Sequence, residues 1–124
     1  MSTPQKKILV VDDEIDTLEL LRTVLEHEKF KVLKAVNGKD ALEQVKQIPD
    51  LVLLDVRMPG GLSGLDVCKQ LKQDERYKEI PVIIFSAKVL DRDIELGLKA
   101  GAVEYVTKPF SSKELIRLIN LHIS

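Results

Sequence analysis

The segment Leu51–Leu54 is an uninterrupted apolar run that leads directly into a single carboxylate, Asp55. A run of this kind is typical of a strand buried on both faces, as in a parallel β-sheet. Residues 58–61 (Met-Pro-Gly-Gly) then break the chain, so Asp55 is expected where the strand ends. In an open α/β sheet, ligand chemistry gathers at the carboxyl ends of the strands. We therefore predict that Asp55 is the central residue of a functional site.

Two further apolar runs, Ile8–Val11 and Val82–Phe85, predict buried strands, and shorter strands are predicted over residues 31–36 and 102–107. Each strand is followed by helical periodicity. The predicted helices run from Ile15 through Leu25, from Ala41 to Ile48, from Leu65 through Leu71, from about Asp91 to Ala100, and from a cap at Ser111 to Ile123. Five strands alternating with five helices predict an α/β fold with a parallel sheet, right-handed crossovers and helices on both faces.

The helix predicted over residues 91–100 has the weakest pattern of the five. Its apolar content is Ile94, Leu96 and Leu98, and Gly97 lies in its interior. A glycine inside a helix costs about 1 kcal/mol relative to alanine. We therefore expect this segment to be mobile.

Composition narrows the class of protein. The chain of 124 residues is interpreted as one domain over residues 1–124, with its core at about 6–123 and no second domain. The 19 basic and 20 acidic side chains nearly cancel and only five residues are aromatic, which argues against direct contact with nucleic acid or a membrane surface. The single cysteine, Cys68, fits a core position and a reducing compartment. Without a signal peptide or a membrane-spanning run, the protein is expected to be soluble and cytoplasmic.

Reactive side chains follow four of the predicted strands. In a parallel sheet, one edge would collect Asp12, Asp13, Asp55, Ser86 and Lys108. Three carboxylates in one crevice repel one another, and Mg²⁺, which prefers oxygen ligands, removes this conflict. A lysine and a hydroxyl beside the metal suit a phosphoryl group, because they offset and hydrogen-bond its oxygens. Since an aspartate can attack phosphorus, the predicted chemistry is phosphoryl transfer onto Asp55.

Each of these residues also has a purely structural interpretation. The acidic residues 12–14 can cap a helix, Asp55 can end a strand in a turn, Ser86 can be a turn hydroxyl, and Lys108 can be a solvated surface side chain. The functional hypothesis is favoured because four of the five predicted strands each end in a residue that phosphoryl chemistry needs.

Four segments resemble the receiver domain of bacterial two-component response regulators. They are residues 8–14 (Ile-Leu-Val-Val-Asp-Asp-Glu), 53–59 (Leu-Leu-Asp-Val-Arg-Met-Pro), 85–87 (Phe-Ser-Ala) and 105–110 (Tyr-Val-Thr-Lys-Pro-Phe). The resemblance covers essentially the whole chain. It implies a flavodoxin-like, CheY-like fold with strand order 2-1-3-4-5.

The resemblance also implies a role for each residue of the acidic edge. Asp55 matches the phosphoacceptor, and Asp13 and Asp55 match direct Mg²⁺ ligands. Asp12 matches the acidic neighbour that acts through water, and the backbone carbonyl of Arg57 completes the protein's ligands. Lys108 matches the lysine that contacts the phosphoryl oxygens.

Ser86 and Tyr105 match the switch pair of the family. The hydroxyl is expected to move toward the phosphoryl group on phosphorylation, while the ring turns inward into the space it leaves. Tyr105 could alternatively be a half-buried strand aromatic without such a role. The peptide bond between Lys108 and Pro109 is expected to be cis.

Two features concern the surroundings of Asp55. Arg57 and Lys88 occupy the positions two residues after Asp55 and Ser86, and we predict that they set the dephosphorylation rate. The loop Gly60–Ser63 holds one residue more than is usual after Met-Pro, which leaves its path near the metal and its contact with a partner open.

The implied function is a phosphorylation-activated signalling switch. A histidine kinase or histidine phosphotransfer protein would donate to Asp55, and the protein would catalyse only its own phosphorylation and dephosphorylation. A face built from the fourth helix, fifth strand and fifth helix would then change its affinity for a downstream protein. That face is expected on or near Val89, Leu90, Tyr105 and Lys113, in a monomer or a phosphorylation-dependent dimer.

Two alternatives remain at this stage. The chain could be the receiver of a longer regulator with a DNA-binding output domain. It could also be a Mg²⁺-dependent phosphohydrolase of the haloacid-dehalogenase type, but such enzymes need a second aspartate two residues after the nucleophile, where this chain has Arg57.

Overall fold

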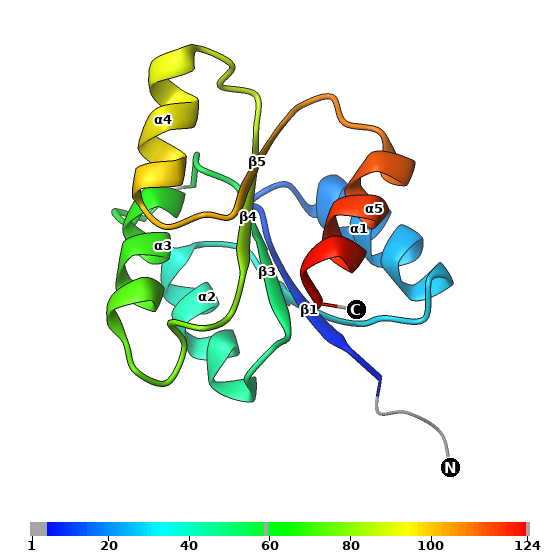
Figure 1. Ribbon diagram of the computed structural model, residues 1–124. Coiled ribbons are helices and arrows are strands. Elements are labelled where there is room, and N and C mark those ends of the chain that lie inside the picture. The colour runs from blue at the N-terminus through cyan, green and yellow to red at the C-terminus, as the bar shows by residue number, and fades with distance from the viewer. Residues whose placement is uncertain (1–4, 59, 124) are drawn as a thin grey trace.

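A parallel five-stranded sheet with strand order β2-β1-β3-β4-β5 forms the centre of the computed structural model, which describes residues 5–58 and 60–123 (Figure 1). The strands are β1 (Lys7–Val11), β2 (Lys31–Ala35), β3 (Leu51–Leu54), β4 (Val82–Ser86) and β5 (Glu104–Thr107). The helices are α1 (Ile15–His27), α2 (Gly38–Gln44), α3 (Gly64–Gln73), α4 (Asp91–Lys99) and α5 (Ser112–Ile123), and the 3-10 turn η1 (Val45–Gln47) extends α2. This strand order and the parallel pairing of all neighbours confirm the predicted fold.

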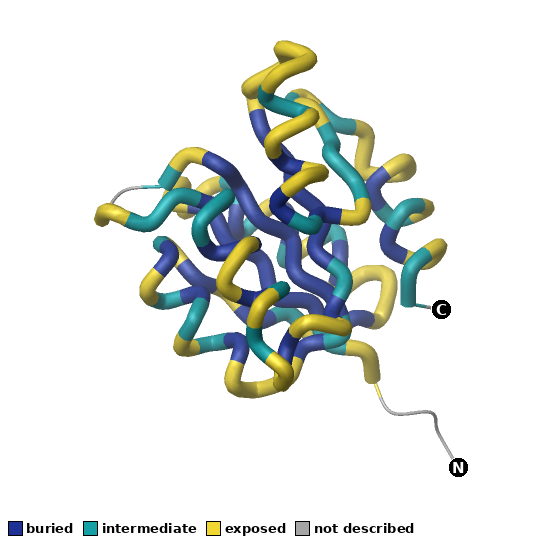
Figure 2. Tube along the Cα trace, turned by 60° about the vertical axis from the view of Figure 1, so that its left-hand side comes forward, coloured by how far each residue is buried: buried dark blue, intermediate teal, exposed yellow. Residues whose placement is uncertain are grey.

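Helices cover both faces of the sheet, with α1 and α5 on one face and α2, α3 and α4 on the other (Figure 1). Because successive strand residues point to opposite faces, β1 contributes to two separate cores. Ile8 and Val10 pack with α1 and α5, whereas Leu9 and Val11 pack with α2 and α3. Figure 2 shows the buried strands between more exposed helices. Burial on both faces explains why the strands read as continuous apolar runs rather than as alternating patterns.

The helix predicted from Ala41 to Ile48 begins earlier and ends earlier than expected. Asn37 caps its start, because the Asn37 side chain accepts a hydrogen bond from the N–H of Asp40. At the other end, Ile48 has a left-handed φ of 53°, which is incompatible with a continuing helix. The prediction used apolar spacing and Pro49 as its limits and did not use the cap.

The last strand is shorter than predicted and begins at Glu104 rather than Ala102. Gly101 has a φ of 111°, and the N–H of Ala102 donates back to the carbonyl of Gly97. These are features of a helix ending, so Ala102 belongs to the termination of α4 and not to the sheet.

Helix α4 and strand β5 form the least buried part of the sheet structure. Gly97 is the buried residue of α4, and β5 is half-buried except for exposed Thr107. The mobility expected for this helix stays a prediction. Among the described residues, the helices are all too short or too polar to cross a membrane.

Candidate functional site

The carboxyl ends of β1, β3, β4 and β5 meet at one edge of the sheet. The N–H of Asp55, just beyond β3, donates to the carbonyl of Val11 at 3.0 Å. The N–H of Lys108, just beyond β5, donates to the carbonyl of Ser86 at 2.8 Å. Sheet-type hydrogen bonds therefore continue past the strand ends and hold the backbone of the predicted site residues.

Three carboxylates lie together at this edge. Asp12 is fully buried, Asp55 is 6% exposed and Asp13 is exposed, and one carboxylate oxygen of each lies within 4.8 Å of the others. Burial raises the pKa of Asp12, and hydrogen bonds from the Glu14 N–H and from Lys108 offset this only in part. The edge thus concentrates negative charge where water screens it poorly.

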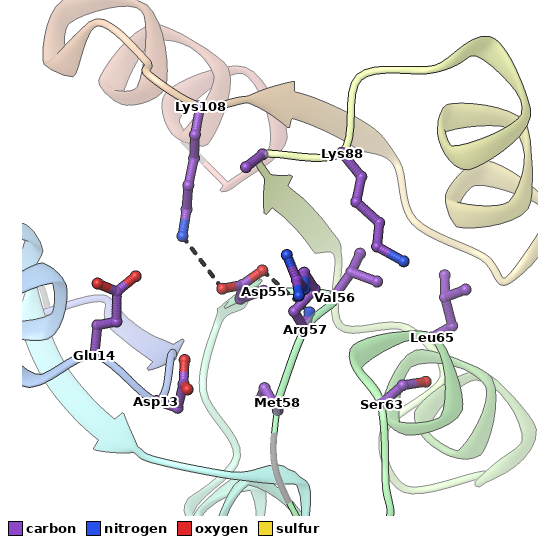
Figure 3. A pocket seen from close by; sticks show the side chains of 11 residues that line it. Asp13, Glu14, Asp55, Val56, Arg57, Met58, Ser63, Leu65, Lys88 and Lys108 are labelled. Atoms are coloured by element: carbon purple, nitrogen blue, oxygen red, sulfur yellow. Dashed lines mark hydrogen bonds and ion pairs between the residues drawn. The ribbon is translucent and has the colours of Figure 1, made fainter.

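Lys108 bridges the two buried carboxylates. Its Nζ donates to Oδ2 of Asp12 at 3.1 Å and to Oδ2 of Asp55 at 3.2 Å, and the latter contact is visible in Figure 3. Burial disfavours the ammonium, but hydrogen bonding and attraction from the two aspartates outweigh it and raise the pKa of Lys108. The Lys108–Pro109 peptide bond is cis, and Nζ lies 4.8 Å from the centre of the Phe85 ring. The ammonium of Lys108 therefore points at the predicted acceptor.

The donor set fits a magnesium ion. Mg²⁺ prefers oxygen ligands and is commonly held by one or two carboxylates while it keeps several waters. Asp12, Asp13 and Asp55 supply clustered carboxylate oxygens, and the exposure of Asp13 gives solvent access on one side. The residues of this edge could therefore hold one divalent cation.

An open pocket of about 670 Å³ lies over Asp55. Asp13 and Glu14 line the pocket from the end of β1, while Arg57 and Lys88 lie on the other side of the acceptor (Figure 3). The Arg57 N–H also donates to Oδ1 of Asp55 at 3.2 Å. Both residues predicted to tune dephosphorylation therefore border the space that a phosphoryl group on Asp55 would enter.

Two contacts position the described residues of the loop between β3 and α3. The N–H of Gly64 donates to the carbonyl of Val56 at 2.8 Å, and Leu62 lies against Gly38, where an added Cβ would come within 2.6 Å of the Leu62 Cβ. Gly60 and Gly61 have φ values of 90° and 92°, which residues other than glycine rarely adopt. Pro59 lies outside the described residues. The additional residue predicted in this loop thus falls in a segment that has two consecutive glycines at positive φ and the apolar contact of Leu62.

The predicted switch pair, Ser86 and Tyr105, is connected through the backbone of Lys88. Ser86 is fully buried, and its Oγ accepts a hydrogen bond from the Lys88 N–H at 3.1 Å. The Tyr105 hydroxyl donates to the Lys88 carbonyl at 2.8 Å. Burial raises the pKa of Tyr105, and the Ser86 hydroxyl beside it lowers that pKa by less. A serine hydroxyl can accept one bond and still donate its own proton, so Ser86 can serve a second oxygen.

Gly64 is a site residue that the sequence reasoning did not identify. A Cβ at this position would collide with the carbonyl oxygen of Asp55. The signal was present, because a glycine directly after the cap residue Ser63 is a poor helix former at the start of α3. Gly64 therefore allows the backbone of α3 to approach the backbone of Asp55.

Residues 8–120 match the response regulator receiver domain family. This match includes all four strand ends described above. The chain belongs to the response regulator receiver domains. Members of this family are phosphoacceptor signalling switches that work with histidine kinases or phosphotransfer proteins.

Curated relatives of this receiver domain are regulators that bind DNA or control transcription. It is 40% identical over 124 residues to the DNA-binding response regulator MtrA of Mycobacterium tuberculosis, covering 99% of this chain and 53% of the relative. It is 44% identical over 111 residues to the alkaline phosphatase synthesis transcriptional regulatory protein PhoP of Bacillus subtilis, covering 89% of this chain and 45% of the relative. The receiver domain thus spans about half the length of these relatives.

Solved structures show the same fold. The chemotaxis protein CheY4 of Vibrio cholerae superimposes with a TM-score of 0.89 at 24% identity, covering 96% of this chain and 99% of that chain. The likeness confirms the CheY-like architecture predicted for this receiver domain.

Proposed function

We propose that this receiver domain accepts a phosphoryl group on Asp55 from a phosphohistidine of a partner kinase or phosphotransfer protein. The observation that carries the proposal is the position of the Lys108 ammonium, which lies 3.2 Å from the Asp55 carboxylate in the pocket that both residues line. An oxygen of Asp55 attacks phosphorus, and the O–P bond forms as the P–N bond to the donor imidazole breaks. The imidazole nitrogen leaves with the electron pair.

Lys108 and Ser86 have separate tasks in this reaction. Lys108 offsets charge on the phosphoryl oxygens, and its second contact, to Asp12, holds the ammonium at the edge of the pocket. The Ser86 hydroxyl donates a hydrogen bond to a phosphoryl oxygen once the acyl phosphate has formed. In this proposal the protein catalyses only its own phosphorylation and dephosphorylation.

The same edge would hold Mg²⁺ through Asp13 and Asp55 directly, through Asp12 by way of water, and through the backbone carbonyl of Arg57. Bound there, the cation would neutralise negative charge on the phosphoryl oxygens. The supporting observation is the cluster of carboxylate oxygens within 4.8 Å of one another.

Phosphorylation is proposed to act on partners through α4, β5 and α5. The Ser86–Lys88–Tyr105 hydrogen bonds connect the acceptor pocket to β5. Val89 and Leu90 are 56% and 54% exposed beside this path, which supports a role in a partner-binding face.

Intact mass after incubation with Mg²⁺ and acetyl phosphate tests the proposal. Wild type should gain one phosphoryl group, and so should Asp91→Asn, a change at an exposed aspartate at the start of α4. Asp55→Asn, which keeps the shape of the acceptor but is a poor nucleophile, should gain none. An equal adduct on Asp55→Asn would show that the acceptor is another residue.

The proposed roles of Arg57 and Lys88 need a second measurement. Both line the pocket over Asp55. The lifetime of the phosphorylated form should therefore change in Arg57→Ala and in Lys88→Ala. If both variants lose phosphate at the wild-type rate, these residues do not control the access of water.

A second candidate is favoured by the coverage of the relatives. Since the chain covers about half of the DNA-binding regulator MtrA and of the transcriptional regulatory protein PhoP, we propose residues 1–124 as one receiver unit that could act as the input half of a longer transcriptional regulator. The complete gene would decide between this and a receiver that acts alone.

A further inference from the structure

The ring of Tyr105 occupies a notch in helix α4 that only glycine can provide. A Cβ placed on Gly97 would lie 2.7 Å from Cδ2 and 3.0 Å from Cε2 of Tyr105. Both distances are far shorter than an ordinary carbon–carbon contact. Any larger residue at position 97 would require either the ring or the helix to move.

A residue of strand β4 closes this notch on the side of the sheet. The same Cβ would lie 3.1 Å from Cδ1 of Ile84, a fully buried residue of β4 whose register partner in β5 is Tyr105. Because Ile84 is fixed in the core, a side chain at position 97 could not relieve its overlap with the ring by moving into the sheet. Gly97 is also the buried residue of α4, so the helix comes close to the sheet at this position.

The opposite end of the ring is tied to the acceptor pocket. The Tyr105 hydroxyl donates to the Lys88 carbonyl at 2.8 Å, and the Lys88 N–H donates to Ser86 Oγ at 3.1 Å. The ring therefore contacts α4 along its edge and the β4–α4 connection at its hydroxyl. Movement of the ring would affect both contacts together.

We propose that Gly97 couples the Ser86–Lys88–Tyr105 hydrogen bonds to the position of helix α4. Because Gly97 has no side chain, the ring of Tyr105 can turn inward, and the backbone of α4 then packs directly against the ring. The proposal explains why a residue that weakens helices stands in the middle of α4. The consequence of this coupling, that a phosphoryl group on Asp55 favours the inward ring, rests on the proposed function. With a methyl group at position 97, the inward ring is excluded and the coupling is lost.

Fluorine NMR tests the ring position without any phosphoryl group. The full chain carries two tyrosines, Tyr77 and Tyr105, so 3-fluorotyrosine gives two resonances. In Gly97→Ala, the Tyr105 resonance should shift toward that of solvent-exposed fluorotyrosine. The resonance of Tyr77, which is 5% exposed, should stay in place and report an intact fold. Leu98→Ala, at an exposed residue of the same helix, should move neither resonance.

Beryllofluoride, a phosphoryl analogue added with Mg²⁺, tests the coupling. Its apparent affinity should fall at least about fivefold in Gly97→Ala, the lower end of typical couplings between sites, and should not change in Leu98→Ala. A purely structural effect of alanine would stabilise α4 and leave this affinity unchanged. Adding Tyr105→Ala to Gly97→Ala removes the overlap, so the double variant should show no further loss relative to Tyr105→Ala alone.

The outcomes separate this proposal from the phosphorylation proposal. An unshifted Tyr105 resonance in Gly97→Ala, or unchanged beryllofluoride affinity, would overturn the role of Gly97. Failure of wild type to bind beryllofluoride would overturn the phosphorylation of Asp55, and the fluorine spectrum would still decide whether Gly97 seats the ring.

Discussion

Strands β1 and β3 lie at the centre of the sheet with their apolar residues buried, whereas β5 lies at the edge and is half-buried along most of its length. The proposed acceptor Asp55 and its neighbour Asp12 extend from the central strands, and Tyr105 lies on β5. Chemistry on a carboxylate requires fixed geometry, which a tightly packed core supplies. Switching requires a second packing arrangement of similar free energy, and weakly packed elements provide it. The packing of the two regions thus agrees with the different tasks proposed for them.

The largest expected contrast is in stability. Leu54→Ala, in the fully buried β3, should lower the free energy of unfolding by about 2–5 kcal/mol. Leu98→Ala, at a residue of α4 that is 46% exposed, should change it by less than about 0.5 kcal/mol. Urea denaturation of both variants measures the difference. Equal losses would mean that α4 is as firmly packed as the centre of the sheet.

A substitution of Lys108 tests whether the centre of the sheet needs a positive charge beside its buried carboxylates. Lys108→Met leaves the buried carboxylates of Asp12 and Asp55 without their cation and should cost about 1–3 kcal/mol. Mg²⁺ should bind this variant more tightly than wild type, because the ammonium no longer competes for the same oxygens. The thermal midpoint with and without MgCl₂ measures both effects, and a smaller magnesium response in the variant would contradict the competition.

Tyr105→Phe tests whether the edge strand β5 and helix α4 open independently of the central strands. The change removes the hydrogen bond to the Lys88 carbonyl and keeps the ring in the Gly97 notch. Since this bond is partly exposed, global stability should fall by about 1 kcal/mol or less. Amide hydrogen exchange should accelerate in α4 and the β4–α4 connection but not in β1 or β3. Faster exchange throughout the sheet would show that the edge is not an independent unit.

An effect of similar size is expected at Cys68, whose Sγ donates to the carbonyl of Ala100 at the end of α4. Burial raises the pKa of the Cys68 thiol to about 11 from its ordinary 9.0. Between these values the unfolded thiol has released its proton while the folded thiol keeps it, so stability is lost as the pH rises. Wild type should lose about 1 kcal/mol more than Cys68→Ala between pH 8 and pH 10. Equal losses would mean that the end of α4 opens readily to water.

Much of the fold could be predicted because its signals are local. The runs at Ile8–Val11, Leu51–Leu54 and Val82–Phe85 are buried strands because no polar residue interrupts them. Local caps explain the errors, since the side chain of Asn37 and the backbone of Gly101 set element ends that apolar spacing does not reveal. Strand order came from the family resemblance, because crossover helices of similar length permit several orders.

The residues at the strand ends could be identified from the sequence alone, since an aspartate, a serine or a lysine directly after an apolar run is visible without coordinates. The bridge from Lys108 to Asp12 and Asp55, which lie 96 and 53 positions away along the chain, became visible only in the folded structure. So did the close approach of Gly97 to the ring of Tyr105. The physical reason is that strand formation depends on neighbours in sequence, whereas ion pairs and steric notches depend on distances that exist only after the sheet and helices have packed.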